Sequence, residues 1–523
     1  MWVCRRDKQP LYSCYVDFKK AYDTIPRDLL WVKLQRIGIH GDFLRGIQAL
    51  YAEVPMGVQF ADGLSSTFNS LLGVKQGCPL SPTLFGIFID DFQAELEAGA
   101  RNFDLPSLSG VQTPALFYAD DLALVSSTTA GLQAQLDLLE AYSSRWRLTV
   151  NVKKTKAVVY RTMHSKVECP KLTYMSAPIE VLDTFRYLGV DLHSTQSFAA
   201  ASKPRAEAAG RALLALRYRC SDLGLQDPIL LRHLFDALVR PAMLYGVEAW
   251  GPGALCGKGM ADCEVVQRTF LRSLLGVRAG TPTAVLLGEA GAFPVYHTAA
   301  MLLCRFWNRL VAMPDGRLTK QAFLENVAMA TRSGPVRTAC WAAQVASFLD
   351  FMSPIVDGVP QHIDPDAMTA FLQRRHFESV NCSDLHKVQQ WLRIRGGQLN
   401  GSSYTMAGYL QAVASRTGRV RLAQMRSGSH WLGVETGRWE RVERQQRLCK
   451  RCGCGDVDDE AHMIWKCPAL MDQRVAHSEL FNTGIDSLAS FFDQDPGKLA
   501  SFLRQCRDEC AAIEGWGRPE EAF

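Results

Sequence analysis

The sequence has no long hydrophobic run. Its 523 residues contain no uninterrupted apolar stretch of about 18 residues, the length that a transmembrane helix needs. Residues 1–6 read MWVCRR and lack the apolar core of a secretory leader. We therefore expect a protein of the nucleus or the cytoplasm that is not secreted and does not contact a membrane.

The chain also lacks a strong charge of either sign, internal repeats and low-complexity tracts. Its 58 Lys and Arg residues against 53 Asp and Glu residues give a net charge of +5, which is too small to predict a nucleic-acid partner from composition. The 16 cysteines are mostly scattered, and we expect most of them to be buried thiols in a reducing compartment. The length allows about two to four domains.

Two adjacent aspartates, Asp120 and Asp121, stand between the short apolar runs 115–118 and 122–125. Each run has the length of a buried strand, so the pattern predicts a hairpin. Neighbouring carboxylates raise the pKa of each other, and a divalent cation such as Mg²⁺ removes that cost. An exposed hairpin turn without a metal is the alternative.

A third carboxylate, Asp17, lies near the end of an aromatic and β-branched run at residues 11–18, which predicts a strand. If this strand pairs with the Asp120–Asp121 hairpin, three carboxylates meet at one edge of a sheet. That is the ligand set of a two-metal site for phosphoryl transfer.

The other patterns predict strands interleaved with helices, and therefore an α/β or α+β domain with one main sheet. We expect Ser81 to cap the helix at 83–97 and Pro26 to begin another that ends near residue 38. Further helices are predicted at 41–52, 129–146, 199–223, 228–250 and 260–275. The predicted strands are a hairpin of 57–60 with 66–71 around Asp62, short strands at 148–150 and 157–160, and one strand at 185–190.

Five segments occur in the order of known polymerase motifs. They are 16–23 (VDFKKAYD), 73–82 (GVKQGCPLSP), 117–121 (FYADD), 151–155 (NVKKT) and 185–189 (FRYLG). This series resembles motifs A to E of the reverse transcriptase palm, most closely that of non-LTR (LINE-type) retrotransposons, over roughly residues 11–195. The resemblance implies an α+β palm at 1–195, with an antiparallel sheet packed on helices. It implies a helical thumb at 196–280, and we divide the rest into a helical connection of unknown role at 281–415, a basic segment with a zinc-knuckle-like site at 416–475 and a helical tail at 476–523.

The resemblance also implies roles for individual residues. Asp17, Asp120 and Asp121 would bind two Mg²⁺ ions, and Lys154 would protonate the pyrophosphate leaving group, although Lys154 and its neighbour Lys153 are alternatively solvated charges. Tyr22 would lie under the nucleotide sugar or, alternatively, belong to the core. The residues implied to contact the nucleotide or the primer are Phe18, Tyr22, Gln76, Gly77, Tyr118, Ala119, Leu188 and Gly189.

The thumb-like region has only a mild basic excess. Residues 203–278 contain eleven Lys and Arg residues against seven Asp and Glu residues. A thumb would hold an RNA–DNA hybrid through its phosphates. A plain helical bundle is the alternative.

Four residues near the C-terminus, Cys449, Cys452, His462 and Cys467, have the C-x2-C-x9-H-x4-C spacing of a tetrahedral Zn²⁺ site. Cys454 is an alternative to Cys452. Residues 416–451 contain ten Lys and Arg residues and three Glu residues, together with Trp431 and Trp439. This basic segment is typical of a surface that holds RNA or DNA by charge and stacking, or alternatively of a solvated helix face.

Taken with the resemblance, these features predict an RNA-directed DNA polymerase that uses an RNA template, a DNA primer or target, and dNTPs. The family has fingers before motif A, and some members have an endonuclease, neither of which we find here. We therefore expect a fragment of a longer element, which is either a truncated genomic copy or an incomplete gene model. Fingers supplied by a partner chain are a further alternative. The alternative function is an inactive remnant that only binds nucleic acid.

Overall fold

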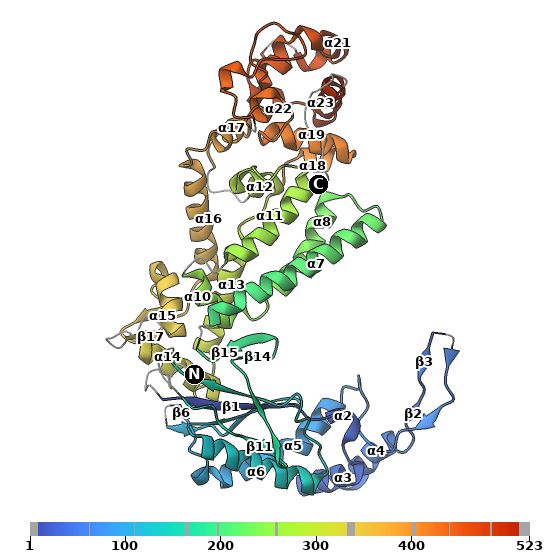
Figure 1. Cartoon of the computed structure of the whole chain (residues 1–523), viewed down its shortest axis with the longest axis vertical. Coiled ribbons are helices and arrows are strands. Elements are labelled where there is room, and N and C mark those ends of the chain that lie inside the picture. Colours follow the sequence, from blue (N-terminus) through green and yellow to red (C-terminus); the bar gives the residue numbers. More distant parts are fainter. Residues whose placement is uncertain are drawn as a thin grey trace. The chain divides into compact units, whose positions relative to one another are not determined.

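The structure is a computed structural model in which two compact units are distinguished, residues 1–201 with 310–361, and residues 202–309 with 362–523 (Figure 1). The residues that it describes are 9–61, 63–108, 110–162, 167–195, 198–256, 260–331, 340–399, 404–438, 440–481 and 484–511. Among these residues, no helix is both long enough and apolar enough to cross a membrane.

The first unit is built on a five-stranded sheet with the order β13–β10–β1–β9–β8. The fully buried strand β1 (Leu11–Val16) lies in the centre, antiparallel to β10 (Lys156–Tyr160) and to β9 (Asp121–Ser126). At one edge β8 (Ala115–Tyr118) pairs antiparallel with β9, and at the other β13 (Glu180–Val181) pairs parallel with β10. The sheet is therefore antiparallel, as predicted, except at β13.

Helices cover one face of this sheet. The helices α5 (Ser81–Ala98) and α6 (Thr129–Trp146) lie on one side of β1, and the hairpin of β14 (Thr184–Tyr187) and β15 (Val190–His193) lies on the other (Figure 1). Because side chains alternate along a strand, Cys14 and Val16 join the core under the helices, whereas Tyr15 packs with Phe185 and Tyr187. The first unit is an α+β fold with a core on each face of its sheet.

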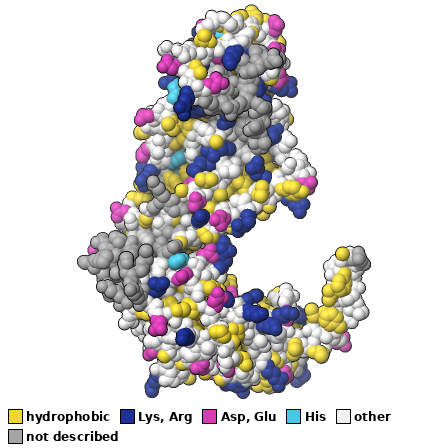
Figure 2. Space-filling view, viewed as in Figure 1, with side chains coloured by type: hydrophobic (Ala, Val, Ile, Leu, Met, Phe, Trp, Pro, Cys, Tyr) yellow, Lys and Arg dark blue, Asp and Glu magenta, His cyan; other side chains and the backbone are white. Residues whose placement is uncertain are grey.

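The smaller elements of the first unit surround this sheet. They are α2 (Ala21–Thr24), α3 (Arg27–Arg36), α4 (Gly41–Leu50), β2 (Pro55–Met56), β3 (Gln59–Phe60), β4 (Gly63–Leu64), β5 (Phe68–Asn69), β6 (Ser107–Leu108), β7 (Val111–Gln112), β11 (Thr173–Tyr174), β12 (Ala177–Pro178), α14 (Leu318–Thr331), α15 (Trp341–Phe348), β16 (Ile355–Val356) and β17 (Val359–Pro360). The predicted hairpin around Asp62 is confirmed by the pairs β2–β5 and β3–β4, although Asp62 itself lies outside the described residues. This hairpin exposes apolar side chains, among them Phe60 and Leu64 (Figure 2).

Three local predictions were wrong. Ser81 does not cap its helix but is the first residue of α5, and its hydroxyl donates to the Lys75 carbonyl at 2.5 Å. The strand predicted at 148–150 is only an isolated bridge between Val150 and Phe18. The strand predicted at 185–190 is the β14–β15 hairpin, because Leu188 and Gly189 have φ angles of 47° and 76° and turn the chain.

The second unit is helical. Its α-helices are α7 (Ser202–Asp222), α8 (Pro228–Leu234), α9 (Arg240–Leu244), α10 (Val247–Leu255), α11 (Ala261–Leu275), α12 (Thr283–Ala290), α13 (Val295–Val311), α16 (Pro365–Asn381), α17 (His386–Ile394), α18 (Tyr409–Ala412), α19 (Arg416–Arg426), α20 (Gly433–Thr436), α21 (Met471–Ala476), α22 (Leu488–Phe492) and α23 (Pro496–Ala511). The single helix predicted at 228–250 is interrupted by a π-helical turn at Phe235–Val239 and by Gly246, which has a φ of 67°. Pro241 lacks the N–H that would continue a regular helix at this point.

Candidate active site and candidate metal centre

The pairing of β1 with β9 brings two of the three aspartates to one edge of the sheet. In the register of this pair Val16 lies opposite Leu122, so Asp17, the next residue, lies beside Asp121. Asp120 occupies the two-residue turn between β8 and β9, together with Ala119, whose φ of 53° is left-handed. Asp17 is therefore a neighbour of Asp120 and Asp121 in space, although about a hundred residues separate it from them in the sequence.

The charges of these carboxylates act on one another. Partial burial, and then the negative charges of Asp120 and Asp17, raise the pKa of Asp121. Burial and the charge of Asp120 likewise raise the pKa of the Tyr22 hydroxyl. A divalent cation would offset this repulsion, so the donor set fits a hard metal ion. The three aspartates do not, however, bring three oxygens within 4.8 Å of one another, and among the described residues only cysteine- and histidine-containing groups converge so closely.

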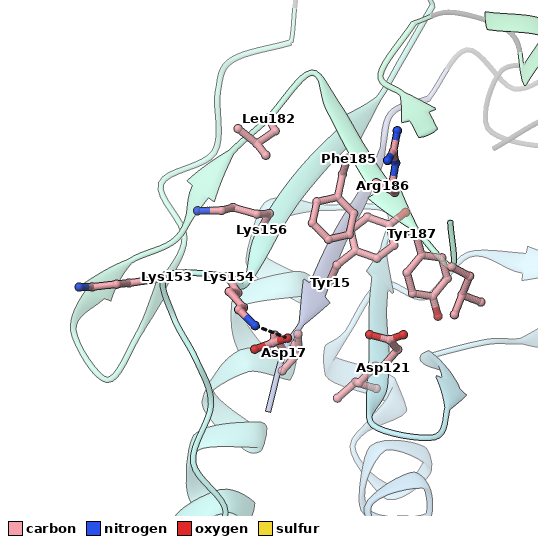
Figure 3. A pocket seen from close by; sticks show the side chains of 13 residues that line it. Tyr15, Asp17, Asp121, Lys153, Lys154, Lys156, Leu182, Phe185, Arg186 and Tyr187 are labelled. Carbon is pink, nitrogen blue, oxygen red and sulfur yellow. Dashed lines mark ion pairs between the residues drawn. The ribbon is translucent and has the colours of Figure 1, made fainter. Parts of the chain in front are cut away.

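A cavity of about 460 Å³ opens beside Asp17 and Asp121 (Figure 3). The Lys154 ammonium lies 3.9 Å from the nearer Asp17 oxygen, whereas the Lys153 side chain points away from it (Figure 3). Three aromatic side chains, Tyr15, Phe185 and Tyr187, also line this cavity. The ring centroid of Tyr15 lies 4.6 Å from that of Phe185 and 4.8 Å from that of Tyr187.

The loop before α5 adds a further polar group. The Gln76 amide donates to a carboxylate oxygen of Asp23 at 2.8 Å, and the Val74 N–H donates to the Tyr22 carbonyl at 2.7 Å. The Tyr22 ring stacks on Phe85 with centroids 5.0 Å apart. Tyr22 and Gln76 are thus held at the same local junction of α2 and the loop.

The four predicted zinc ligands also come together. The ligand atoms of Cys449, Cys452, His462 and Cys467 all lie within 4.8 Å of one another, and Cys449, His462 and Cys467 are buried. A π-helical turn at His462–Lys466 begins with His462, and Cys467 follows directly after it. The Arg451 guanidinium donates to the Cys449 sulfur at 3.4 Å. Such a cluster of soft ligands can hold a metal ion.

Cys454 lies at the rim of this cluster. Its sulfur is exposed and lies 3.0 Å from the Cys452 sulfur. It also belongs to a second group, with Asp456 and His462, that shares the same histidine. The geometry therefore includes Cys452 in the four-ligand group and leaves Cys454 as an alternative ligand.

The basic segment 416–451 does not expose Trp431 as the predicted stacking surface would require. Trp431 is only 4 % exposed and lies under the guanidinium groups of Arg421 and Arg507, so it is not available to stack on a base. Trp439 lies outside the described residues. The Lys and Arg residues of the segment that are exposed are Arg416, Arg438, Arg441, Arg444 and Lys450.

Several of the remaining arginines of this segment stabilise the second unit internally. Arg426 pairs with the buried Glu289 at 3.1 Å, and that carboxylate also accepts from the Trp391 indole at 2.8 Å. Arg419 donates to three backbone carbonyls. Part of the charge that indicated a nucleic-acid surface therefore lies inside the protein.

Comparison with known proteins finds a family match within the first unit. Residues 3–192 match the family described as reverse transcriptase (RNA-dependent DNA polymerase). They form a reverse transcriptase domain. The predicted resemblance is confirmed by relatives that are retrotransposon polymerases.

Two of these relatives come from R2 elements. The Pol polyprotein of the R2 element of Popillia japonica is 23 % identical over 497 residues, covering 91 % of this chain and 61 % of the relative. That of R2DM from Drosophila melanogaster is 30 % identical over 207 residues, covering 37 % of this chain and 19 % of the relative. The chain thus spans about three fifths of the length of the first of these relatives.

The similarity to solved structures is weaker. Telomerase from Candida tropicalis aligns with 62 % of this chain and 50 % of its own, at 12 % identity and a TM-score of 0.29. A similarity at this level carries no argument about fold or function.

The other predicted site residues of the reverse transcriptase domain have distinct environments. Phe18 is buried and packs in the core under the helices, while Tyr118 is 64 % exposed at the end of β8. Gly77 is exposed with a φ of 80°. Leu188 and Gly189 form the turn of the β14–β15 hairpin, and Leu188 also lines the cavity beside Asp17.

Two cations with structural roles in the reverse transcriptase domain were not predicted from the sequence. Arg27 donates to carbonyls of the loop that carries Gln76. Lys33 is buried and donates to Asp91 at 2.6 Å and to the Tyr142 hydroxyl at 2.7 Å. Lys33 could have been found in the sequence as a lysine in the middle of a helix that packs on apolar neighbours. Arg27 gives no such signal, because it follows Pro26 at the start of a helix and resembles a solvated charge.

Proposed function

We propose that this chain is an RNA-directed DNA polymerase of a non-LTR retrotransposon that adds dNTPs to the 3′ end of a primer. The observation that supports it most is the β1–β9 pairing, which brings Asp17 beside Asp121 within a domain that matches the reverse transcriptase family. We propose an RNA template, a DNA primer or target strand and dNTPs as its substrates.

We propose that Asp17, Asp120 and Asp121 hold two Mg²⁺ ions. When bound, these ions would activate the primer hydroxyl and neutralise the charge of the transferred phosphate. The raised pKa of Asp121, caused by partial burial and then by the charges of Asp120 and Asp17, supports this assignment, because it marks a site where positive charge is needed.

The side chains around the carboxylates have separate tasks in this proposal. The Lys154 ammonium, held near Asp17, donates a proton to the leaving pyrophosphate oxygen. Tyr22, supported from behind by Phe85, lies under the sugar of the incoming nucleotide. Gln76 and Gly77 line the nucleotide pocket, and the turn at Leu188 and Gly189 contacts the primer.

We further propose that Cys449, Cys452, His462 and Cys467 hold one structural Zn²⁺. Three sulfurs and one imidazole nitrogen within 4.8 Å of one another support a closed tetrahedral site. The rest of the proposed organisation is a palm at 1–195, a helical thumb at 196–280, a connection at 281–415, the basic zinc-containing segment at 416–475 and a tail at 476–523.

Primer extension by the purified chain tests this function. The substrate is a DNA primer annealed to an RNA template, with Mg²⁺ and dNTPs, and the Asp120→Ala/Asp121→Ala double variant is the control. We expect extension that the double variant abolishes. Hybrid binding without extension by either protein would instead support the alternative, a remnant that only binds nucleic acid.

A further inference from the structure

The loop that carries Gln76 is anchored by a single arginine. Arg27, the first residue of α3, donates from Nε to the Gly73 carbonyl at 2.9 Å and from Nη2 to the Leu72 carbonyl at 3.1 Å. Its Nη1 donates to the carbonyls of Ser70 at 2.9 Å and Tyr51 at 3.1 Å. A guanidinium has five N–H donors, so four of them are used on the backbone.

The same loop is fastened to α2 on its other side. The Gly73 N–H donates to the Ile25 carbonyl at 2.9 Å, and the Val74 N–H donates to the Tyr22 carbonyl at 2.7 Å. Gly73 has a φ of 78°, and a Cβ on it would lie 2.5 Å from the Asp23 carbonyl oxygen. The backbone is thus closer to α2 than any side chain at position 73 would permit.

The anchored loop continues to Gln76, which we propose above to line the nucleotide pocket. Three residues after Gly73, the Gln76 amide donates to the Asp23 carboxylate at 2.8 Å. Both of these side chains are exposed, so burial does not hold them in place. Their relative position depends on the backbone between residues 70 and 76.

We propose that Arg27 is a positioning residue of the polymerase site, which fixes the loop at 70–73 so that Gln76 meets Asp23 where the incoming nucleotide binds. Arg27 itself does not touch the nucleotide. This inference rests on the proposed function, because it assigns a role in nucleotide binding to the contact of Gln76 with Asp23.

Lysine cannot replace arginine here. An ammonium is a point charge with three donors on a flexible chain, and it cannot span four carbonyls in the plane of a fork. Arg27→Lys keeps the charge and removes the fork, so it separates geometry from electrostatics. Arg145→Lys is the matched control, since Arg145 makes a two-pronged contact with Glu95, at 2.9 and 3.0 Å, in the same unit and away from the loop.

Hydrogen exchange measured by mass spectrometry on the full chain tests the anchoring without any need for activity. We expect Arg27→Lys to speed exchange in peptides that contain the Gly73 and Val74 amides, and to leave peptides of β1 and α6 unchanged. Arg145→Lys should leave the loop peptides at the wild-type rate. Wild-type exchange in the loop of Arg27→Lys would overturn the proposal.

Steady-state kinetics test the consequence at the site. We expect Arg27→Lys to raise the KM for dNTP by about tenfold or more with a much smaller effect on kcat, because a misplaced contact group weakens productive binding. In a Gln76→Ala background the same substitution should change KM no further. An equal rise in both backgrounds would show that Arg27 does not act through Gln76. If the wild-type chain does not extend primers, the proposed function fails, and the exchange measurement alone decides whether Arg27 anchors the loop.

Discussion

Lys154 and Lys153 are neighbours in the sequence with different positions in the reverse transcriptase domain. The Lys154 ammonium lies 3.9 Å from Asp17, and Lys153 points away (Figure 3). We predict that Lys154→Ala lowers kcat by about 10- to 100-fold with little change in the KM for dNTP, because a positioned general acid contributes at least that much. Lys153→Ala is the control and should keep kcat within about twofold of wild type. Single-turnover incorporation rates measure both, and equal losses in the two variants would contradict the assignment.

Lys33 gives a pH-dependent stability. Burial lowers the pKa of its ammonium to about 8, although Asp91 opposes the shift. Below pH 8 the lysine is charged in the folded and the unfolded chain, so the full cost of burying the charge is present. Between pH 8 and the ordinary value of 10.5 the folded chain loses the proton first, and stability therefore rises with pH.

We predict that the melting temperature of the wild type rises relative to that of Lys33→Met as the pH increases from 7 to 9.5. The free energy of unfolding of the wild type minus that of Lys33→Met should increase by at most about 1.4 kcal/mol per pH unit above pH 8. Lys171→Met, at an exposed position of the same unit, is the control and should show no such trend. A wild-type-minus-variant difference that decreases as the pH rises would contradict the sign of the effect.

The sequence singles out residues where a motif contains them, and misses residues whose partners are distant in the chain. Asp17, Asp120 and Asp121 follow from short patterns and from a resemblance to known motifs. Lys33 does not, since its partners Asp91 and Tyr142 lie 58 and 109 residues further along the chain. Only the packing of α3 against α5 and α6 brings them together.

At the scale of elements, most of the strands and helices predicted for the first unit lie close to the bounds that the structure has, because periodicity and turn residues mark them. The exceptions have local causes. The sequence predicts one strand in place of the β14–β15 hairpin because its turn contains Leu188, an apolar residue that is uncommon at a positive φ. It predicts Ser81 as a cap because serine before Pro82 is typical of one, but the Ser81 hydroxyl donates to the preceding loop instead.

The geometry of the cysteine cluster leads to a prediction about which residues bind the metal ion. We predict that the full chain binds one equivalent of Zn²⁺, that Cys452→Ser and Cys467→Ser lose it, and that Cys454→Ser keeps it. The reason is that Cys452 belongs to the four-ligand group, whereas Cys454 lies outside it. Metal analysis after dialysis, with the Co²⁺ absorption spectrum as a second readout, measures the difference. Loss of the metal from Cys454→Ser and its retention in Cys452→Ser would reverse the assignment.

At the scale of the whole molecule, the sequence does not predict which distant segments belong to the same compact unit. Residues 310–361 belong to the same compact unit as the reverse transcriptase domain, although more than a hundred residues separate the two segments. No composition shift or motif marks this, since α14 and α15 have the pattern of ordinary helices. The basic segment 416–451 shows the same limit, because its charge count does not distinguish Arg426, which pairs with the buried Glu289, from the exposed Arg438.

The central claim is that the three carboxylates at the edge of the sheet form a polymerase site. Single-nucleotide incorporation by the full chain, on an RNA template with a DNA primer, tests it most directly when wild type, Asp17→Asn and Asp137→Asn are compared. Asp137 is an exposed aspartate of α6 in the same domain and serves as the matched control.

We predict incorporation by the wild type and by Asp137→Asn, and a loss of at least about a thousandfold in Asp17→Asn, because each carboxylate would hold charge that the transition state requires. Incorporation that survives in Asp17→Asn would contradict the claim. Absence of incorporation in all three proteins, with hybrid binding retained, would show a reverse transcriptase domain that has kept its carboxylates without the activity.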